Sequence, residues 1–321
     1  MHLPAKDDII TLYTKKCPLN LTVKKGVAGI NNPNFKEKAE LFTEDLSKKG
    51  RSEATIIAYA KDIEQLLNYL SKLGIDSLDK VTIEQLEGYR QNLQDNNYTP
   101  KSVSRKINST RTFFRYLLDH NYIQDNISEK LAHPRFELKP PRVLSEMEYR
   151  ALRDVSRVDI RLYSIVEILL QTGIRIGELA GLSLEDIRTS KDGKINYLYV
   201  KAAGSHPSRK VPLNKSAKKA LDDYLTVRPE TEDDTVFVTK NGRPLLVRNI
   251  RTAIDKAFEK AGIKNAKVND LRNTFIAHHL ANGVGLPTVS KLVGHKRLST
   301  TEKYLNIIKP VGKEERNLKE L

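Results

Sequence analysis

This chain of 321 residues has no tryptophan, a single cysteine and no long apolar run. The single cysteine, Cys17, excludes an internal disulfide and suits a reducing compartment. No run approaches the roughly 20 apolar residues of a membrane helix, and the first residues lack the apolar core of a signal peptide. With 39% hydrophobic residues, the chain is expected to be a globular protein of the cytoplasm.

Acidic residues are also scarce relative to basic ones. There are 40 Asp and Glu against 55 Lys and Arg, which gives a net charge of +15. Such a surplus suits a polyanion such as nucleic acid, because basic groups that neutralise phosphates release counterions. An anionic membrane is less favoured, since the Lys and Arg are spread along the chain and not gathered in one amphipathic helix. We therefore expect a protein associated with the nucleoid.

The first half of the chain has the pattern of a helical domain. Ile56, Tyr59, Ile63 and Leu66 recur at steps of three and four, so one face is apolar. Together with segments 35–48, 83–93 and 101–118, this predicts a small bundle of four helices. Prolines then stiffen an extended linker. The predicted parts are an N-terminal extension at 1–34, the helical domain at 35–133, the linker at 134–141, a second domain at 142–308 and a tail at 309–321.

The second domain mixes helices with a short sheet. Ser145 and Glu148 form a capping box at a helix start, and 160–170 is strongly apolar. Alternating β-branched and aromatic residues predict strands at 194–200 and 209–213, with a third at 235–238. From residue 248 onward the helical pattern returns, and Tyr304 is expected on the last short helix.

Four short stretches of this second domain stand out together: TGIRIGEL at 172–179, DLRNTF at 270–275, LVGH at 292–295 and STTEKY at 299–304. In this order and spacing the chain resembles the tyrosine recombinase, or phage integrase, family, in its simple two-domain, Xer-like form. ATIIAY at 54–59 and STRTFFRYL at 109–117 are similar to the family's core-binding domain. The resemblance implies a mainly α fold with a small β-sheet, in which a four-helix SAM-like domain and an α+β catalytic domain form a C-shaped clamp on DNA.

The chemistry of strand cleavage fits the residues in these motifs. A phosphodiester under attack becomes a pentacoordinate dianion, which two guanidinium groups can hold through bidentate hydrogen bonds. Arg175 and Arg272 are the candidates, and His295 is expected to hydrogen-bond the phosphate or move a proton. The resemblance makes Tyr304 the nucleophile, which takes a DNA 3′-phosphate and releases a 5′-hydroxyl. Because this covalent link conserves the bond energy, no metal and no other cofactor is expected.

Two positions depart from the family pattern. Three residues before the second arginine the family usually has histidine, whereas this chain has Asn269, whose amide cannot accept a proton at neutral pH. The family's hairpin lysine falls by count on Ala203. Lys201 is therefore the first candidate for the general acid, with His206 and the weaker Lys210 as alternatives. Lys201 reads equally well as a solvated or phosphate-contacting strand residue.

Basic and small polar residues crowd the predicted helix at 101–118. Small polar side chains among cations suit close approach to a DNA groove, and in the family the matching helix contacts the major groove. A solvated basic face is the alternative. The predicted DNA contacts on this helix, the linker and the second domain are Lys101, Ser102, Ser104, Arg105, Lys106, Ser109, Arg111, Arg135, Lys139 and Arg248.

The sequence therefore predicts a site-specific recombinase of double-stranded DNA that exchanges strands through a four-way junction. The resemblance implies a homotetramer on paired sites, while the free oligomeric state and an accessory protein stay open. One alternative is a DNA-binding protein of the same fold with weakened or lost cleavage, and another is an enzyme that relaxes supercoils by related chemistry. The presence of Tyr304 together with both arginines favours the recombinase.

Overall fold

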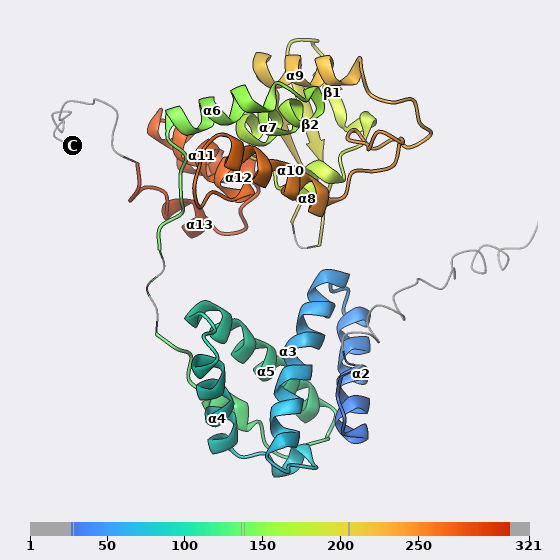
Figure 1. The fold of residues 1–321 in the computed structure, drawn as a ribbon, viewed down its shortest axis with the longest axis vertical. Helices are drawn as coiled ribbons and strands as arrows, with labels where there is room; N and C mark the ends of the chain where they lie inside the picture. The colour runs from blue at the N-terminus through green and yellow to red at the C-terminus, as the bar shows by residue number, and fades with distance from the viewer. Residues whose placement is uncertain (1–26, 28, 136, 138, 205, 309–321) are drawn as a thin grey trace, which may run out of the picture. The chain divides into compact units, whose positions relative to one another are not determined.

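The computed structural model describes residues 27, 29–135, 137, 139–204 and 206–308. The predictions for residues up to 26, Cys17 included, and for the tail at 309–321 fall outside the described residues. The chain divides between residues 138 and 139 into two units, each with its own hydrophobic core (Figure 1). In the part of the chain that is described, no helix is both long and apolar enough to span a bilayer.

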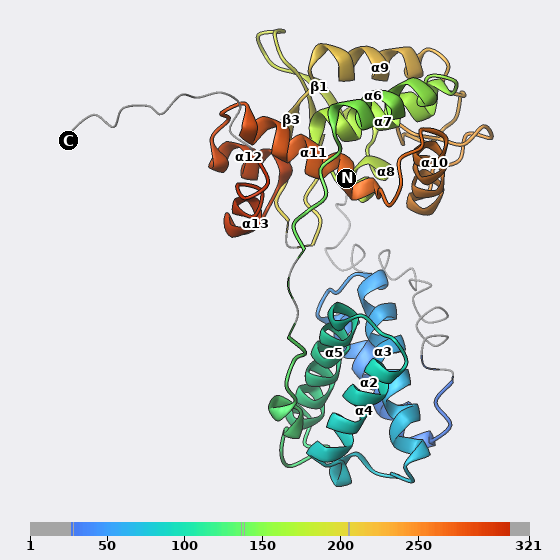
Figure 2. The same cartoon turned by 60° about the vertical axis from the view of Figure 1, so that its left-hand side comes forward.

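The described residues of the first unit form four α-helices, as the sequence predicted for this part of the chain (Figure 2). Their starts are set by small polar caps: the Asn32 side chain accepts hydrogen bonds from two backbone N–H groups, and Thr82 forms a capping box with Gln85. In the core, the rings of Phe42 and Phe113 meet edge to face at 5.2 Å. The elements are α2 (Pro33–Lys48), α3 (Glu53–Lys72), η1 (Leu78–Lys80), α4 (Ile83–Asp95), α5 (Pro100–Asp119) and η2 (Ile127–Lys130).

A buried carboxylate joins α3 to α5. Asp62 is 2% exposed and accepts hydrogen bonds from the Arg105 guanidinium (2.8 Å), the Lys106 ammonium (3.0 Å) and the Ser109 hydroxyl (2.7 Å). Three donors satisfy the carboxylate, which meets the condition for keeping a charge inside a core. This network fixes the register of the two helices.

The second unit surrounds a long buried helix, α7, which packs against α6, α9 and α11. Helix α7 begins at the Asp159 cap and is apolar on most of its surface, so neighbours cover it on several sides. The elements are α6 (Glu146–Ser156), α7 (Ile160–Thr172), α8 (Ile176–Ala180), η3 (Leu184–Asp186), β1 (Ile187–Thr189), β2 (Asn196–Val200), β3 (Arg209–Pro212), α9 (Lys215–Leu225), α10 (Val247–Lys260), α11 (Val268–Ala281), α12 (Leu286–Val293) and α13 (Ser299–Glu302).

The sheet has three antiparallel strands in the order β1-β2-β3, with Leu198 opposite Val211. The third strand is β1, so the predicted strand at 235–238 was wrong. That segment makes only isolated bridges, from Thr235 to Ser183 and from Val238 to Pro244. Its apolar residues fill the core instead: Phe237 is fully buried and stacks on Tyr224 at 5.0 Å. Continuous burial, and not sheet pairing, explains its composition.

Candidate active site

Two glycines end helices where the site begins. Gly173 follows α7 with φ 62°, and a side chain there would approach the Phe275 ring to 2.5 Å. Gly294 follows α12 with φ 69°, and a side chain there would approach the Arg209 guanidinium to 3.0 Å. Both positions need a left-handed backbone and close contact, which only glycine supplies without strain. The two turns bring the sequence motifs at 172–179 and 292–295 together.

Three arginines meet the last carbonyl groups of α12. Arg209 Nε donates to the Leu292 carbonyl (2.8 Å), Arg272 donates to that of Val293 (2.6 Å) and Arg175 to that of Gly294 (2.8 Å). The final carbonyls of a helix have no partner within it and carry its negative end, so cations are favoured there. The end of α12 is thus the point at which the site's positive charge is assembled.

Glu178 holds two of these arginines. Its carboxylate accepts from Arg209 at 2.9 and 2.7 Å, and from the Arg175 guanidinium and backbone N–H, each at 2.8 Å. Burial opposes ionisation of Glu178, but the hydrogen bonds from Arg209 and Arg175 outweigh it and lower its pKa to about 2. Arg272 differs, because its second nitrogen donates to the neutral Gly173 carbonyl (2.6 Å). Its charge is therefore left for an anionic ligand.

Tyr304 is buried and lies in the turns that follow α13, not on that helix as predicted. Its hydroxyl donates to Asn273 Oδ1 at 2.8 Å. The same oxygen accepts from the Asn269 amide (3.2 Å), and Asn273 in turn donates to Asp270 (3.2 Å). A chain of two amides on α11 therefore holds the phenol, and neither amide can accept a proton at neutral pH.

Burial shapes the protonation of these groups. It lowers the pKa of the Arg272 guanidinium to about 10 and that of His295 to about 4, with Arg175 adding to both shifts. It raises the pKa of the Tyr304 phenol, which Arg272 opposes. At pH 7 the site therefore holds a neutral tyrosine and a neutral histidine beside charged arginines. His295 is fixed through Nδ1, which lies 2.8 Å from the Thr301 hydroxyl.

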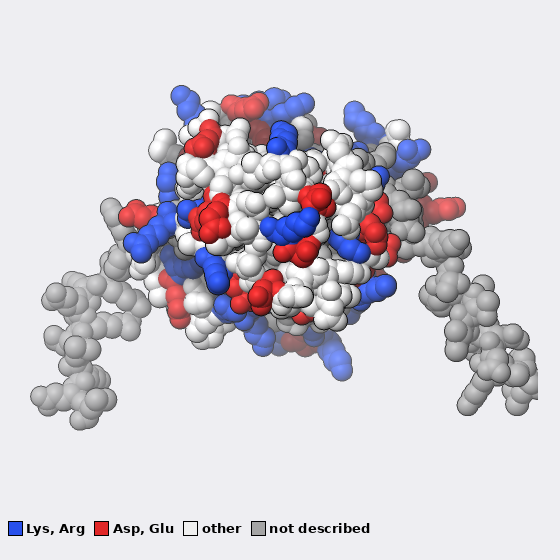
Figure 3. Space-filling model, turned by 90° about the horizontal axis from the view of Figure 1, so that it is seen from below, with Lys and Arg blue, Asp and Glu red and all other residues white. Residues whose placement is uncertain are grey.

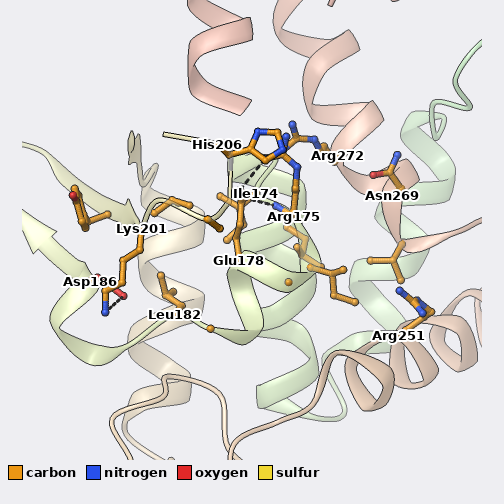
Figure 4. A pocket seen from close by; sticks show the side chains of 18 of the residues that line it. Ile174, Arg175, Glu178, Leu182, Asp186, Lys201, His206, Arg251, Asn269 and Arg272 are labelled. Atoms are coloured by element: carbon orange, nitrogen blue, oxygen red, sulfur yellow. Dashed lines mark hydrogen bonds and ion pairs between the residues drawn. The ribbon is translucent and has the colours of Figure 1, made fainter. Parts of the chain in front are cut away.

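An open pocket of about 890 Å³ lies beside these residues, and Arg175, Lys201, His206, Asn269 and Arg272 line it (Figure 4). The arginines and His206 lie near one another in Figure 4, whereas Lys201 turns toward Asp186. The Lys201 ammonium lies 2.8 Å from the Glu185 carboxylate and 3.3 Å from that of Asp186. Within the described ranges, no group of three or more His, Cys, Asp or Glu residues is arranged to hold a metal ion.

The structure thus brings four predicted residues, Arg175, Arg272, His295 and Tyr304, into one corner of the second unit, with Asn269 at its edge. It holds Lys201 on a separate acidic cluster. Two residues of the site were not predicted from the sequence. They are Arg209, which binds Glu178 and the Leu292 carbonyl, and Asn273, which accepts the hydrogen bond from Tyr304. Arg209 had a usable signal: it is the inward position of a strand whose alternate residues are apolar, and an arginine there needs a buried partner.

The predicted DNA contacts on α5 divide by exposure. Lys101 and Arg105 are exposed. Lys106 (6% exposed) and Ser109 (4%) are buried against Asp62, so the structure corrects the prediction that they face DNA. The Arg111 guanidinium donates to backbone carbonyls around η2, among them Leu131 at 2.7 Å. The helical period explains the difference, since positions 106 and 109 lie on the inner face of the helix.

The predicted contacts outside α5, which are Arg135, Lys139 and Arg248, are exposed. On α5 itself, Ser102 and Ser104 are half-buried, and their hydroxyls lie next to Thr99 and His133 respectively. On the face seen in Figure 3, acidic and basic side chains are intermixed. The surplus of positive charge is therefore not concentrated on that face.

Comparison with known proteins gives matches over most of the chain. The model of the Phage integrase family matches residues 142–309, and that of the Phage integrase N-terminal SAM-like domain matches residues 39–121. Tyrosine recombinase XerC of Listeria welshimeri is 31% identical over 275 residues, which are 82% of this chain and 90% of that protein. Tyrosine recombinase XerC of Bacillus pumilus is 30% identical over 290 residues, 86% of this chain and 93% of its own.

Solved structures confirm the fold. A lambda integrase dimer bound to a COC′ core site matches with a TM-score of 0.69 at 17% identity, over 88% of this chain and 79% of that one. XerH site-specific recombinase, bound to a palindromic difH substrate in a post-cleavage complex, matches with a TM-score of 0.67 at 16% identity, over 91% and 92%. A mainly helical chain with a small sheet, divided into a SAM-like and a catalytic part, is shared with both.

Proposed function

The chain belongs to the phage integrase family of tyrosine recombinases, and we propose that it cuts and rejoins double-stranded DNA at specific sites through a covalent bond to Tyr304. The observation that carries the proposal is the assembly of Arg175, Arg272 and His295 around the end of α12. The phenol is hydrogen-bonded to Asn273, the residue next to Arg272 in the chain. A cationic corner beside a tyrosine suits attack on a phosphodiester.

The proposed step is an in-line displacement at phosphorus. The Tyr304 oxygen forms a bond to phosphorus and the bond from phosphorus to the 5′ oxygen breaks. The phenol proton passes to water, and the 5′ oxygen gains a proton from a general acid of the site. Arg175 and Arg272 hold the two non-bridging oxygens as charge builds on them. With Nδ1 engaged by Thr301, His295 uses Nε2 for a further hydrogen bond to the phosphate. A 5′-hydroxyl from a partner strand later reverses the attachment.

We further propose that four copies act on two paired DNA sites. Each chain carries one Tyr304, and a complete exchange between two duplexes cuts four strands, so four tyrosines are needed. A lambda integrase dimer bound to a COC′ core site shares this fold, which supports assembly on the substrate. Because the proposed substrate is double-stranded DNA, we propose that the protein acts in the cytoplasm, at the nucleoid.

A covalent adduct tests the proposal. Sites bound by the protein are selected from a random DNA pool and rebuilt as duplexes with a nick just beyond the cut, so that the short product diffuses away and the intermediate accumulates. The wild type is expected to give a protein–DNA adduct on a denaturing gel, and Tyr304→Phe none. Tyr197→Phe, on strand β2, serves as the matched control. Tight binding without any adduct would favour a protein that binds DNA and does not cleave it.

A further inference from the structure

Strand cleavage at this site needs a source of one proton. The departing 5′ oxygen leaves as an alkoxide, a far stronger base than any side chain, unless it is protonated as its bond to phosphorus breaks. Arg175 and Arg272 are assigned to the two non-bridging oxygens, and a guanidinium is a weaker acid than an imidazolium, so neither is favoured as the donor. Among the described side chains that line the pocket, Tyr199, Lys201, His206 and Lys267 can donate a proton. Lys201 and His206 are the two that lie in the hairpin between β2 and β3, where the general acid is expected from the sequence.

Lys201 is badly placed for this task. Its ammonium contacts the Ser183 hydroxyl (3.0 Å) as well as the carboxylates of Glu185 and Asp186. The hydrogen bond that Lys201 donates to Glu185 raises the pKa of the ammonium, which makes it a weaker acid. In Figure 4 the side chain runs toward Asp186 and away from Arg175. To reach a phosphate held by the arginines, Lys201 would have to leave two carboxylates.

His206 has the opposite surroundings. Paired backbone hydrogen bonds of 3.0 Å with Ala203 fix its place in the hairpin that leads into β3. Its Nδ1 is shielded from solvent and has no hydrogen-bond partner among the described residues. Figure 4 shows the ring beside Arg175 and Arg272. A buried nitrogen without a partner, next to a cationic pocket, is a site that a ligand oxygen can satisfy.

His295 is associated with the segment that carries the attacking Tyr304, and not with the hairpin. Its Nδ1 is tied to Thr301, three residues before Tyr304, so it moves with the nucleophile's own segment. In an in-line displacement the leaving oxygen lies opposite the attacking one. A donor carried by the hairpin, on a different element from Tyr304, meets that requirement.

We propose that His206, in place of Lys201, is the catalytic residue that protonates the departing 5′ oxygen. This inference rests on the proposed function. The proton passes from the imidazolium to the 5′ oxygen as the bond from phosphorus to oxygen breaks, and the ring is left neutral. The reverse reaction returns the proton when a 5′-hydroxyl attacks the phosphotyrosine, so the ring acts as base in that direction.

The charges that face His206 make this proton responsive to DNA. Burial lowers the pKa of the ring, and Arg175, Lys296 and Arg209 lower it further, while Glu178 raises it. His295 is also close enough to interact with it. A bound phosphate adds negative charge beside the ring and favours the imidazolium. His206 therefore takes up a proton when substrate binds and holds it for the leaving group.

Substrates with sulfur in place of the bridging 5′ oxygen test the assignment, because a thiolate leaves without a proton. On the selected nicked duplex, His206→Ala is expected to slow adduct formation by about 10²–10³-fold. On the sulfur substrate its rate should return to within a few fold of wild type. His206→Gln keeps a polar side chain and should behave the same way. Lys194→Ala, at an exposed position before β2, should match wild type on both substrates.

Three results would overturn the inference: a normal rate in both His206 variants, a loss that sulfur does not restore, or sulfur rescue of Lys201→Ala and not of His206→Ala. The second result would make His206 a positioning or structural residue, and the third would make Lys201 the acid. If the wild type forms no adduct, that result would contradict the proposed function and not the assignment of His206. The two failures are therefore distinguishable.

Discussion

The charge of Arg272 is available to a ligand because its hydrogen-bond partners are backbone carbonyls. Arg272 is 6% exposed, yet its two nitrogens donate to backbone carbonyls and not to a carboxylate. Neutral acceptors satisfy the hydrogen-bond geometry without neutralising the charge. The planar guanidinium of Arg272 can donate to Gly173, Val293 and a phosphate at once. A lysine at this position offers one ammonium and cannot bridge all three.

For that reason Arg272→Lys should reduce adduct formation by about 10²-fold or more while DNA affinity changes little. The rate is measured on the nicked duplex, and affinity by titration at fixed salt. The thermal unfolding midpoint of the variant provides the control for folding. Adduct formation at the wild-type rate would remove Arg272 from the proposed phosphate clamp.

Glu178 makes the stability of the second unit depend on pH. Its folded pKa of about 2 lies below the ordinary value of 4.5, so its contribution is complete above pH 4.5 and is lost as the pH falls from there toward 2. By linkage this amounts to about 3 kcal/mol. Glu178→Gln should lower the free energy of unfolding at pH 7 by up to that amount and flatten its decline below pH 4.5.

Urea unfolding at several pH values measures this effect, and Glu302→Gln, an exposed position, is the matched control. Parallel pH profiles for the wild type and Glu178→Gln would show that the ion pairs with Arg209 and Arg175 contribute no net stability.

Elements were predictable from sequence where local signals agree with packing. The capped helices of the first unit and α7 follow from apolar period and cap residues, and β2 and β3 follow from alternation. Helix α9 (Lys215–Leu225) was not predicted, although Asn214 caps it, because two of its four buried residues are alanine, which gives a weak apolar signal. The segment 235–238 looked like a strand because full burial and sheet pairing favour the same residues.

The site, too, was only partly predictable from the sequence. Motif spacing predicted Arg175, Arg272, His295 and Tyr304. It could not predict the anchor of the arginines, which is formed by the carbonyls of Leu292, Val293 and Gly294. Backbone carbonyls are present at every residue, so no side-chain pattern marks them. The acidic cluster around Lys201 was not predicted either, because Glu185 and Asp186 come from another element, η3, and no sequence motif links them to Lys201.

The network that joins α3 and α5 predicts a large cost for one substitution. Asp62→Ala should destabilise the protein by about 3–5 kcal/mol, because it leaves the buried Lys106 ammonium without its carboxylate. Unfolding in urea, followed by far-ultraviolet circular dichroism, measures the change. Asp76→Ala removes an exposed partner of Lys80 and should have little effect. Equal effects of the two variants would contradict a structural role for the network.

At the scale of the whole molecule, the net charge of +15 implies binding to DNA that weakens steeply with salt. The slope of log affinity against log salt changes by about 0.9 for each phosphate contact. Lys101→Ala with Arg248→Ala should therefore lower the slope by about 2. Lys80→Ala, exposed on the first unit, should leave it unchanged, and an unchanged slope in the double variant would exclude these two contacts.

The identity of the residue that joins DNA tests the central proposal most directly. The adduct trapped on nicked duplex is digested with nuclease and protease, and the peptide that carries a phosphodeoxynucleotide is sequenced by mass spectrometry. We expect the modification on Tyr304 alone. A nucleotide on any other residue, or an adduct of equal yield in Tyr304→Phe, would contradict the site described for this protein.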